Sequence, residues 1–167
     1  KYELHMPMLL YILRHGEAIE QGYEDSERPL SSVGKEQALV ASKAIKALGV
    51  GLDAVLSSTI ERAKQTAKMI EKELGVKTFS MTQYLIPGSD HLELIKQLNE
   101  LKYNHLLLVG HEPHLSAFIS LLVNGKTYSH IEIKKGSLVL VETPTPIEKG
   151  KGTLKWLLNL DLLKRIA

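Results

Sequence analysis

The chain has 167 residues and contains no cysteine. It therefore has no disulfide, no thiolate nucleophile and no cysteine-ligated zinc site. An excess of charge of one sign is also missing, since 21 basic and 19 acidic residues leave a net charge of +2. That balance argues against a nucleic-acid-binding protein that depends on bulk charge, so we expect no nucleic-acid partner.

Long apolar runs are absent as well. The run over residues 8–13 is followed at once by Arg14, and it is far shorter than the roughly 18–20 residues that cross a bilayer. No signal peptide is recognisable, so we expect a cytoplasmic protein with no membrane partner. We expect Met6 to be the native start, with residues 1–5 added in front of it. The composition is that of a globular chain, and its length predicts one domain over residues 1–167.

Short apolar segments alternate with helical patterns along the first three quarters of the chain. Strands are predicted over 9–13, 53–56, 76–81 and 105–109, with a closing pair over 136–142 and 153–160. Helices are predicted between them, over 32–48, 60–74, 90–101 and 112–123. This order predicts an α/β fold with three α/β/α layers, a mainly parallel central sheet and an antiparallel C-terminal strand pair.

Capping residues mark the ends of the predicted helices. Ser31 or Ser32 suits the N-cap of the first helix, and Ser58 with Glu61 has the spacing of a capping box before the second. Gly75 is placed to end that second helix. Pro113 is expected in the first turn of the helix over 112–123, where proline is tolerated.

Polar side chains that suit a phosphate follow three of the predicted strands. Arg14 and His15 follow the first strand, Arg62 lies just beyond the second, and His111 follows the strand over 105–109. Ligands of parallel sheets bind beyond the carboxyl ends of the strands, so these groups are predicted to share one edge. Arginines and helix N-termini bind phosphate oxygens, and a neutral histidine can attack phosphorus. The pattern predicts a phosphoryl-transfer site that needs no metal and no cofactor.

A family resemblance rests on four segments in this order. Leu13-Arg14-His15-Gly16-Glu17-Ala18 resembles the signature of the histidine phosphatase superfamily, which includes the cofactor-dependent phosphoglycerate mutases. Three further segments resemble its SixA-like phosphohistidine phosphatase branch. They are Asp25-Ser26-Glu27-Arg28-Pro29-Leu30-Ser31 with Gly34, then Ser57-Ser58 with Arg62-Ala63 and Gln65-Thr66-Ala67, then Val109-Gly110-His111-Glu112-Pro113 with Leu115-Ser116. The match runs from about Leu9 to Leu140.

The resemblance implies a role for each matching residue. His15 is the expected nucleophile, which carries the phosphoryl group as a covalent phosphohistidine, and Arg14, Arg62 and His111 are expected to hold that group. The implied activity is a hydrolase that acts on a phosphohistidine protein or a small phosphomonoester.

The proton donor is left open by the sequence. Glu17 and Asp25 are the two candidate acids, although Glu17 could instead orient a neighbour and Asp25 could anchor its loop. Asp90 is expected to cap a helix rather than to act as the acid. A phosphohistidine substrate needs less help, because imidazole leaves without a strong acid.

Further residues are considered for substrate contact. Arg28 is a candidate that could equally form a salt bridge within the loop over 17–31, and Ser57 is a candidate that could equally cap a helix. His111 and His114 have a spacing that invites a metal site, but no other ligands complete it. Lys134 and Lys135 are read as solvated charges of a turn.

Two other functions compete with the phosphatase. A phosphoglycerate-type mutase must shield its phosphohistidine from water, and the short segments over 17–31 and 83–91 offer little material for such a cover. A non-catalytic phosphate-binding or partner-binding module is the other alternative, and the intact set of arginines and histidines speaks against it.

Overall fold

The structure is a computed structural model that describes residues 6–167, so the expectation about residues 1–5 lies outside the described residues. Its centre is a six-stranded sheet in the order β3-β2-β4-β1-β5-β6. In chain order the strands are β1 (Met8–Arg14), β2 (Ala54–Ser58), β3 (Phe79–Thr82), β4 (His105–Gly110), β5 (Leu138–Thr143) and β6 (Thr153–Leu158). The first four are mutually parallel, β5 is antiparallel to β1, and β6 is antiparallel to β5. The predicted sheet with its antiparallel C-terminal pair is confirmed.

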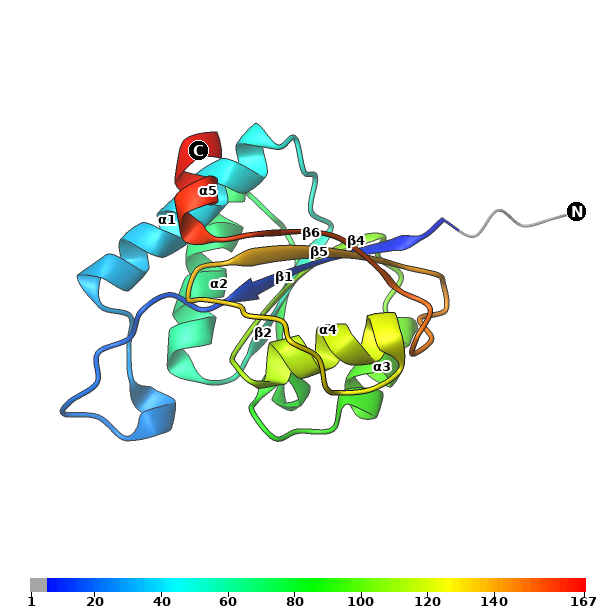
Figure 1. Ribbon diagram of the computed structural model, residues 1–167. Helices are drawn as coiled ribbons and strands as arrows, with labels where there is room; N and C mark the ends of the chain where they lie inside the picture. Colours follow the sequence, from blue (N-terminus) through cyan, green and yellow to red (C-terminus); the bar gives the residue numbers. More distant parts are fainter. Residues whose placement is uncertain (1–5) are drawn as a thin grey trace, which may run out of the picture.

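Helices cover both faces of the sheet and make three layers (Figure 1). They are α1 (Ser32–Ala47), α2 (Glu61–Leu74), α3 (His91–Glu100), α4 (His114–Asn124) and α5 (Leu160–Ile166), with two short turns of 3-10 helix, η1 (Asp25–Glu27) and η2 (Gln83–Leu85). Buried residues of α1, α2 and α5 form one hydrophobic cluster, and those of α3 and α4 form another. The sheet separates the two clusters, as the predicted α/β/α architecture requires.

Strand β1 shows why its sequence is apolar without interruption. Leu10 and Ile12 pack into the cluster of α3 and α4, whereas Tyr11 and Leu13 pack into the cluster of α1, α2 and α5. Successive side chains of a strand point to opposite faces, so a strand covered on both sides buries every residue. This burial fixes the position at which the strand ends and the polar residues Arg14 and His15 begin.

Most of the predicted helix ends are confirmed. The Ser31 hydroxyl accepts a hydrogen bond from the Gly34 amide at the start of α1, and the Asp90 carboxylate accepts two from the first turn of α3. Gly75 ends α2 in the left-handed conformation at a φ of 65°. Gly34 also allows a close approach of two segments, because a Cβ there would overlap the carbonyl oxygen of Glu17.

Several local predictions are wrong. The capping box before α2 is not formed, because the N-cap position falls on Ile60 and no side chain caps the helix. Helix α4 begins at His114, two residues later than predicted, with Pro113 in front of it. The last predicted strand ends at Leu158, and Asn159 then caps α5, a helix that the sequence patterns did not reveal.

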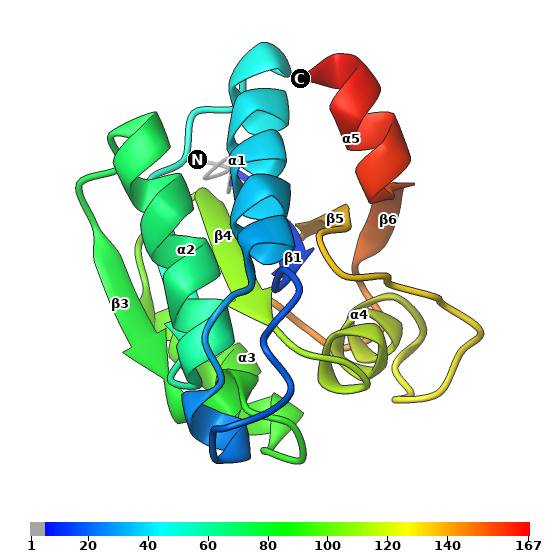
Figure 2. The same ribbon diagram turned by 90° about the vertical axis from the view of Figure 1, so that its left-hand side faces the viewer.

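The carboxyl ends of β1, β2 and β4 meet at one edge of the sheet. Arg14 lies opposite Gly110 in the pairing of β1 with β4, and Ser57 lies opposite Val109 in the pairing of β2 with β4. Figure 2 looks toward this edge, where β1 and β4 end beside the blue loop that contains η1. The residues predicted to share an edge therefore do so. Within residues 6–167, no helix has the length and apolar character needed to cross a membrane.

Candidate active site

His15 lies at the centre of this edge and is 95% buried, with 5% of its surface exposed. Its Nδ1 lies 2.6 Å from the carbonyl oxygen of Gly16, and its Nε2 lies 3.2 Å from Nε of Arg62. Because the arginine can only donate, Nε2 must accept, and Nδ1 must carry the proton that is donated to Gly16. The two contacts together fix one tautomer, with the lone pair on Nε2.

The same surroundings keep His15 neutral. Burial and, to a smaller extent, the charges of Arg62, Arg14 and Lys135 lower the pKa of His15 to about 4, although the hydrogen bond to Gly16 acts in the opposite direction. At neutral pH the imidazole therefore has its lone pair free of a proton, which is the form that attacks phosphorus.

His111 is the second histidine of the site. Its ring centroid lies 5.0 Å from that of His15, and its Nε2 lies 2.9 Å from the hydroxyl of Ser58. Burial and then the neighbouring His15 and Arg62 lower the pKa of His111 to about 3. Its Nδ1 is buried and makes no hydrogen bond to any residue over 6–167. Such a nitrogen is available to a phosphoryl oxygen that enters beside His15.

Arg62 links His15 to the loop over 17–31. Beyond its contact with His15, its Nη1 donates to the main-chain oxygen of Asp25 at 2.8 Å, and its Nη2 lies 3.4 Å from the Asp25 carboxylate. The Asp25 side chain is 72% exposed, and its other oxygen pairs with Arg28 at 3.2 Å. Because the Asp25 carboxylate is largely exposed, its ion pairs contribute little stability, and they orient Arg62 rather than hold the fold together.

The remaining candidate residues are Arg14, Glu17 and Ser57, and each makes a hydrogen bond outside His15. Arg14 donates from Nη1 to the carbonyl oxygen of Ile133 at 2.8 Å, and its charge lowers the pKa of both histidines. Glu17 is tied to the start of α1, where its carboxylate accepts a hydrogen bond of 2.8 Å from Ser31. Ser57 is completely buried, and its hydroxyl donates to the carbonyl oxygen of Ser58. Its predicted contact with substrate stays a prediction.

Three residues matter more than the sequence patterns indicated. Thr66 accepts a hydrogen bond from the Gly16 amide at 3.2 Å and so fixes the His15 loop on α2. Ser58, expected in a capping box, instead contacts His111. The charge of Lys135 lowers the pKa of His15, although Lys135 lies 120 positions further along the chain. Only the pairing of β5 with β1 brings that lysine to the site.

His114 belongs to a separate arrangement. Its Nε2 donates to the carbonyl oxygen of Tyr84 at 2.8 Å, and its ring stacks on His91 at a centroid distance of 4.1 Å. Burial and then the neighbouring His91 lower the pKa of His114 to about 4. Across residues 6–167, no group of three or more histidine, aspartate or glutamate side chains is arranged to hold a metal ion.

These buried histidines predict an acid-sensitive fold. His15, His111 and His114 stay neutral in the native protein down to about pH 4, 3 and 4, whereas each takes up a proton near its ordinary pKa of 6.5 once unfolded. The unfolded chain therefore binds up to about three more protons, and the free energy of unfolding falls as the pH is lowered below 6.5. Urea unfolding at pH 7.5 and 5.5 measures this loss.

A matched variant separates this cause from general acid effects. His114→Gln keeps an N–H donor for Tyr84 but cannot be protonated, so the proton uptake on unfolding should fall by about one. If the free energy of unfolding of the wild-type protein is the same at pH 7.5 and 5.5, the three histidines are not neutral in the native protein because of burial, and the prediction is wrong.

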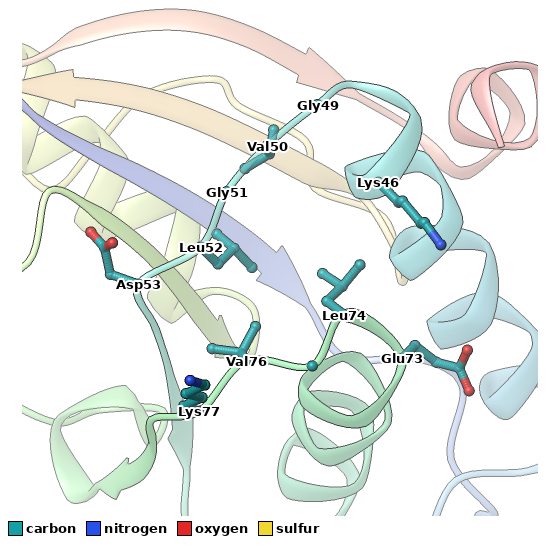
Figure 3. A pocket seen from close by; sticks show the side chains of 11 residues that line it. Lys46, Gly49, Val50, Gly51, Leu52, Asp53, Glu73, Leu74, Val76 and Lys77 are labelled. Carbon is teal, nitrogen blue, oxygen red and sulfur yellow. The ribbon is translucent and has the colours of Figure 1, made fainter.

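A hollow of about 610 Å³ lies at the other end of the parallel strands (Figure 3). It is formed by the segments over 49–53 and 73–77, which lead into β2 and β3, together with Lys46. Leu52, Leu74 and Val76 gather at its centre, and Lys46 and Glu73 lie at its margin. It contains no histidine and no arginine, so it offers no nucleophile and no fork of donors for a phosphoryl group. The side chains that suit a phosphoryl group lie at the edge that holds His15.

The sequence and the fold are similar to those of known proteins. The sequence model of the histidine phosphatase superfamily (branch 1) matches residues 10–83. An uncharacterized protein of Picosynechococcus sp. is 30% identical over 138 residues, which are 79% of this chain and 83% of that protein. The phosphohistidine phosphatase SixA of Escherichia coli is 26% identical and aligns with 95% of this chain and its own full length. A structure of the protein histidine phosphatase SixA with tungstate superimposes with a TM-score of 0.85 at 25% identity, over 94% of this chain and all of that one.

Proposed function

The chain belongs to the histidine phosphatase superfamily, and from this premise we propose that it hydrolyses phosphohistidine on proteins through a phosphorylated His15. The observation that carries the proposal is the pair of hydrogen bonds on the His15 ring, from Nδ1 to Gly16 and from Arg62 to Nε2. They leave one nitrogen as the nucleophile and place a cation against it. The phosphohistidine phosphatase SixA, which aligns with nearly the whole chain, supports the substrate class.

The first step forms a bond between Nε2 of His15 and phosphorus. The bond between phosphorus and the substrate imidazole nitrogen breaks, its electron pair stays on that nitrogen, and the leaving imidazole takes a proton from solvent. Water then attacks the phosphorus of phosphorylated His15, releases phosphate and returns the lone pair to Nε2. Neither step needs an electron donor or acceptor.

Arg62 must turn for the attack to occur. The Nε2 lone pair that accepts from Arg62 cannot at the same time bond to phosphorus. A doubly charged phosphoryl group offers the guanidinium stronger, charge-assisted hydrogen bonds than a neutral imidazole does. Substrate binding therefore frees the nucleophile and moves Arg62 onto the group that is transferred. The two contacts with Asp25 keep the arginine within reach during this exchange.

Arg14, Arg62 and His111 supply the charge and donors that phosphoryl transfer demands. Most of the catalysis in this reaction comes from positioning and from stabilising the oxygens of the transferring group. Two guanidinium groups and an unpartnered ring nitrogen suit that task without a metal ion. We expect activity to persist in excess chelator.

The positions of the acidic side chains near the site also favour a phosphohistidine substrate, whose leaving group needs little help from a proton donor. Within residues 6–167, no carboxylate is hydrogen-bonded to His15 or to His111, and the two candidate acids are engaged elsewhere. Ester substrates need a proton donor for the leaving oxygen, whereas an imidazole leaves more easily. Asp25, held against Arg62, is the better placed of the two candidates if a donor is used.

A substrate panel tests the proposal. It contains a phosphohistidine peptide, a phosphoserine peptide, a small phosphomonoester and 3-phosphoglycerate, each assayed for released phosphate with and without excess chelator. The proposal predicts the highest kcat/KM for the phosphohistidine peptide and no effect of the chelator. Preference for an ester contradicts the substrate class, transfer within phosphoglycerate without released phosphate indicates a mutase, and loss of activity in chelator indicates a metal ion.

A further inference from the structure

A second hollow lies beside Arg14, the residue that precedes His15, on the side of β5. It has a volume of about 410 Å³ and is lined by Arg14, Lys134, Lys135, Asn159, Leu160 and Asp161. We refer to it as the basic hollow. Arg14 belongs both to this hollow and to the sequence motif of the nucleophile, so the hollow begins where the phosphoryl group is expected to bind. Its other lining residues come from the turn before β5 and from the start of α5.

The turn that carries the lysines is held rigidly against Arg14. The Ser137 amide donates to the carbonyl oxygen of Lys134 at 2.9 Å, and Gly136 adopts a φ of 76°, which closes a tight turn with Lys135 in its middle. The Gly136 amide donates to the Arg14 carbonyl oxygen at 3.1 Å, and the Arg14 amide donates to Ser137 at 3.2 Å. The backbone of Lys135 is therefore fixed relative to the residue that precedes the nucleophile.

The far side of the turn is packed as well. A Cβ on Gly136 would lie 3.4 Å from a methyl group of Leu160 and 3.5 Å from Cβ of Gln37. Gln37 in turn accepts a hydrogen bond from the Glu17 amide at 2.8 Å. The turn thus sits between α1 and α5, and its position does not depend on a flexible loop.

The charges of the basic hollow are unbalanced. Three of its lining side chains are cations, and Asp161 is the one acid among them. Over residues 6–167, neither Lys134 nor Lys135 has a carboxylate within 4.0 Å, whereas Lys64 and Lys68 each form such a pair on α2. Lys135 is only partly exposed and is near enough to His15 to lower its pKa. An unpaired, partly buried ammonium beside an anion-binding site favours a second anionic group on the substrate.

We propose that the basic hollow binds an acidic side chain of the phosphorylated protein, next to the phosphohistidine, with Lys135 as its main contact. The inference rests on the proposed function, because it assumes a protein substrate. The hollow of about 410 Å³ has room for a carboxylate side chain, and two of its lining residues, Lys134 and Asp161, are exposed to solvent. Lys134, which is more exposed, attracts the acidic side chain more weakly than Lys135 does, and the negative charge of Asp161 repels that side chain.

Partly exposed ion pairs have modest energies, so the expected selectivity is roughly three- to tenfold in kcat/KM. The substrates are three phosphohistidine peptides that differ only at the two positions on each side of the phosphohistidine, which carry glutamate, glutamine or lysine. The wild-type protein should prefer the glutamate peptide, and the preference should shrink as salt is raised. Lys135→Glu should reverse the order, so that the lysine peptide becomes the best substrate. Asp161→Asn should strengthen the wild-type order.

Lys149→Glu is the matched control for charge. Lys149 is exposed on the connection between β5 and β6, at the end of the sheet away from His15, so the variant changes the net charge equally without touching the hollow. It should keep the wild-type order of the peptides. Thermal unfolding of Lys135→Glu, Asp161→Asn and Lys149→Glu checks that each variant folds.

The outcomes separate the two proposals. Equal rates on all three peptides, or a Lys135→Glu variant that behaves like Lys149→Glu, overturn the assignment of the basic hollow while leaving the phosphohistidine substrate intact. If no peptide is hydrolysed but p-nitrophenyl phosphate is, the protein substrate itself is wrong and the assignment falls with it.

Discussion

Replacing His15 with alanine should reduce kcat on a phosphohistidine peptide by about 10⁴-fold or more, because the phosphoryl group then has no acceptor in the site. The guanidinium of Arg62 keeps its two contacts with Asp25 in this variant, so the anion-binding part of the site remains. The substrate should therefore still bind, and KM should change much less than kcat. Steady-state release of phosphate measures both constants.

His130→Ala is a suitable control for the loss of a histidine. His130 is exposed and lies outside the site, in the segment between α4 and β5. Its kcat should equal that of the wild-type protein. Residual activity of His15→Ala within about tenfold of the wild-type value means that another residue, or water directly, attacks phosphorus.

Removal of the Arg62 side chain is expected to have the second largest effect. Arg62→Ala should lower kcat by about 10²- to 10³-fold, since single donors to the transferring group typically contribute this much. Arg62→Lys should recover only part of the loss. Lysine presents a point charge and cannot reach His15, the main-chain oxygen of Asp25 and the Asp25 carboxylate with one rigid fork.

Arg165→Ala provides the comparison for arginine. Arg165 is exposed in the last turn of α5 and should have wild-type kinetics when removed. Arg62→Ala also frees Nε2 of His15 from its hydrogen bond, so a faster first step in this variant indicates that the contact inhibits more than it helps. That result, or full recovery by Arg62→Lys, contradicts the role given to the guanidinium.

The edge that holds the site was predictable from the sequence. Each of the segments with Arg14, Arg62 and His111 follows an apolar run of strand length, and parallel strands bring their carboxyl ends together. The helix over 60–74 and its end at Gly75 were equally clear, because helix periodicity and a glycine that can adopt the left-handed conformation are local signals. Local signals of this kind identify elements and, through topology, the place where they meet.

Other features depend on contacts between distant segments and were not predictable. Ser58 has the spacing of a capping box, but its hydroxyl accepts a hydrogen bond from the Ile60 amide and contacts His111, so tertiary contacts decide its role. Helix α5 has seven residues and no long amphipathic stripe, and its start depends on the cap at Asn159. Lys135 looked like an ordinary turn charge, because only the antiparallel pairing of β5 with β1 places it beside Arg14.

On the proposed pathway, the phosphoryl group passes through Nε2 of His15. The most direct measurement mixes the protein with a ³²P-labelled phosphohistidine peptide, quenches within milliseconds in alkali, and maps the labelled residue by mass spectrometry. We expect an acid-labile, alkali-stable phosphate on His15 that forms and decays within one turnover, and no such label in His15→Ala. Complete hydrolysis without any labelled protein, or a label on another residue, would contradict it.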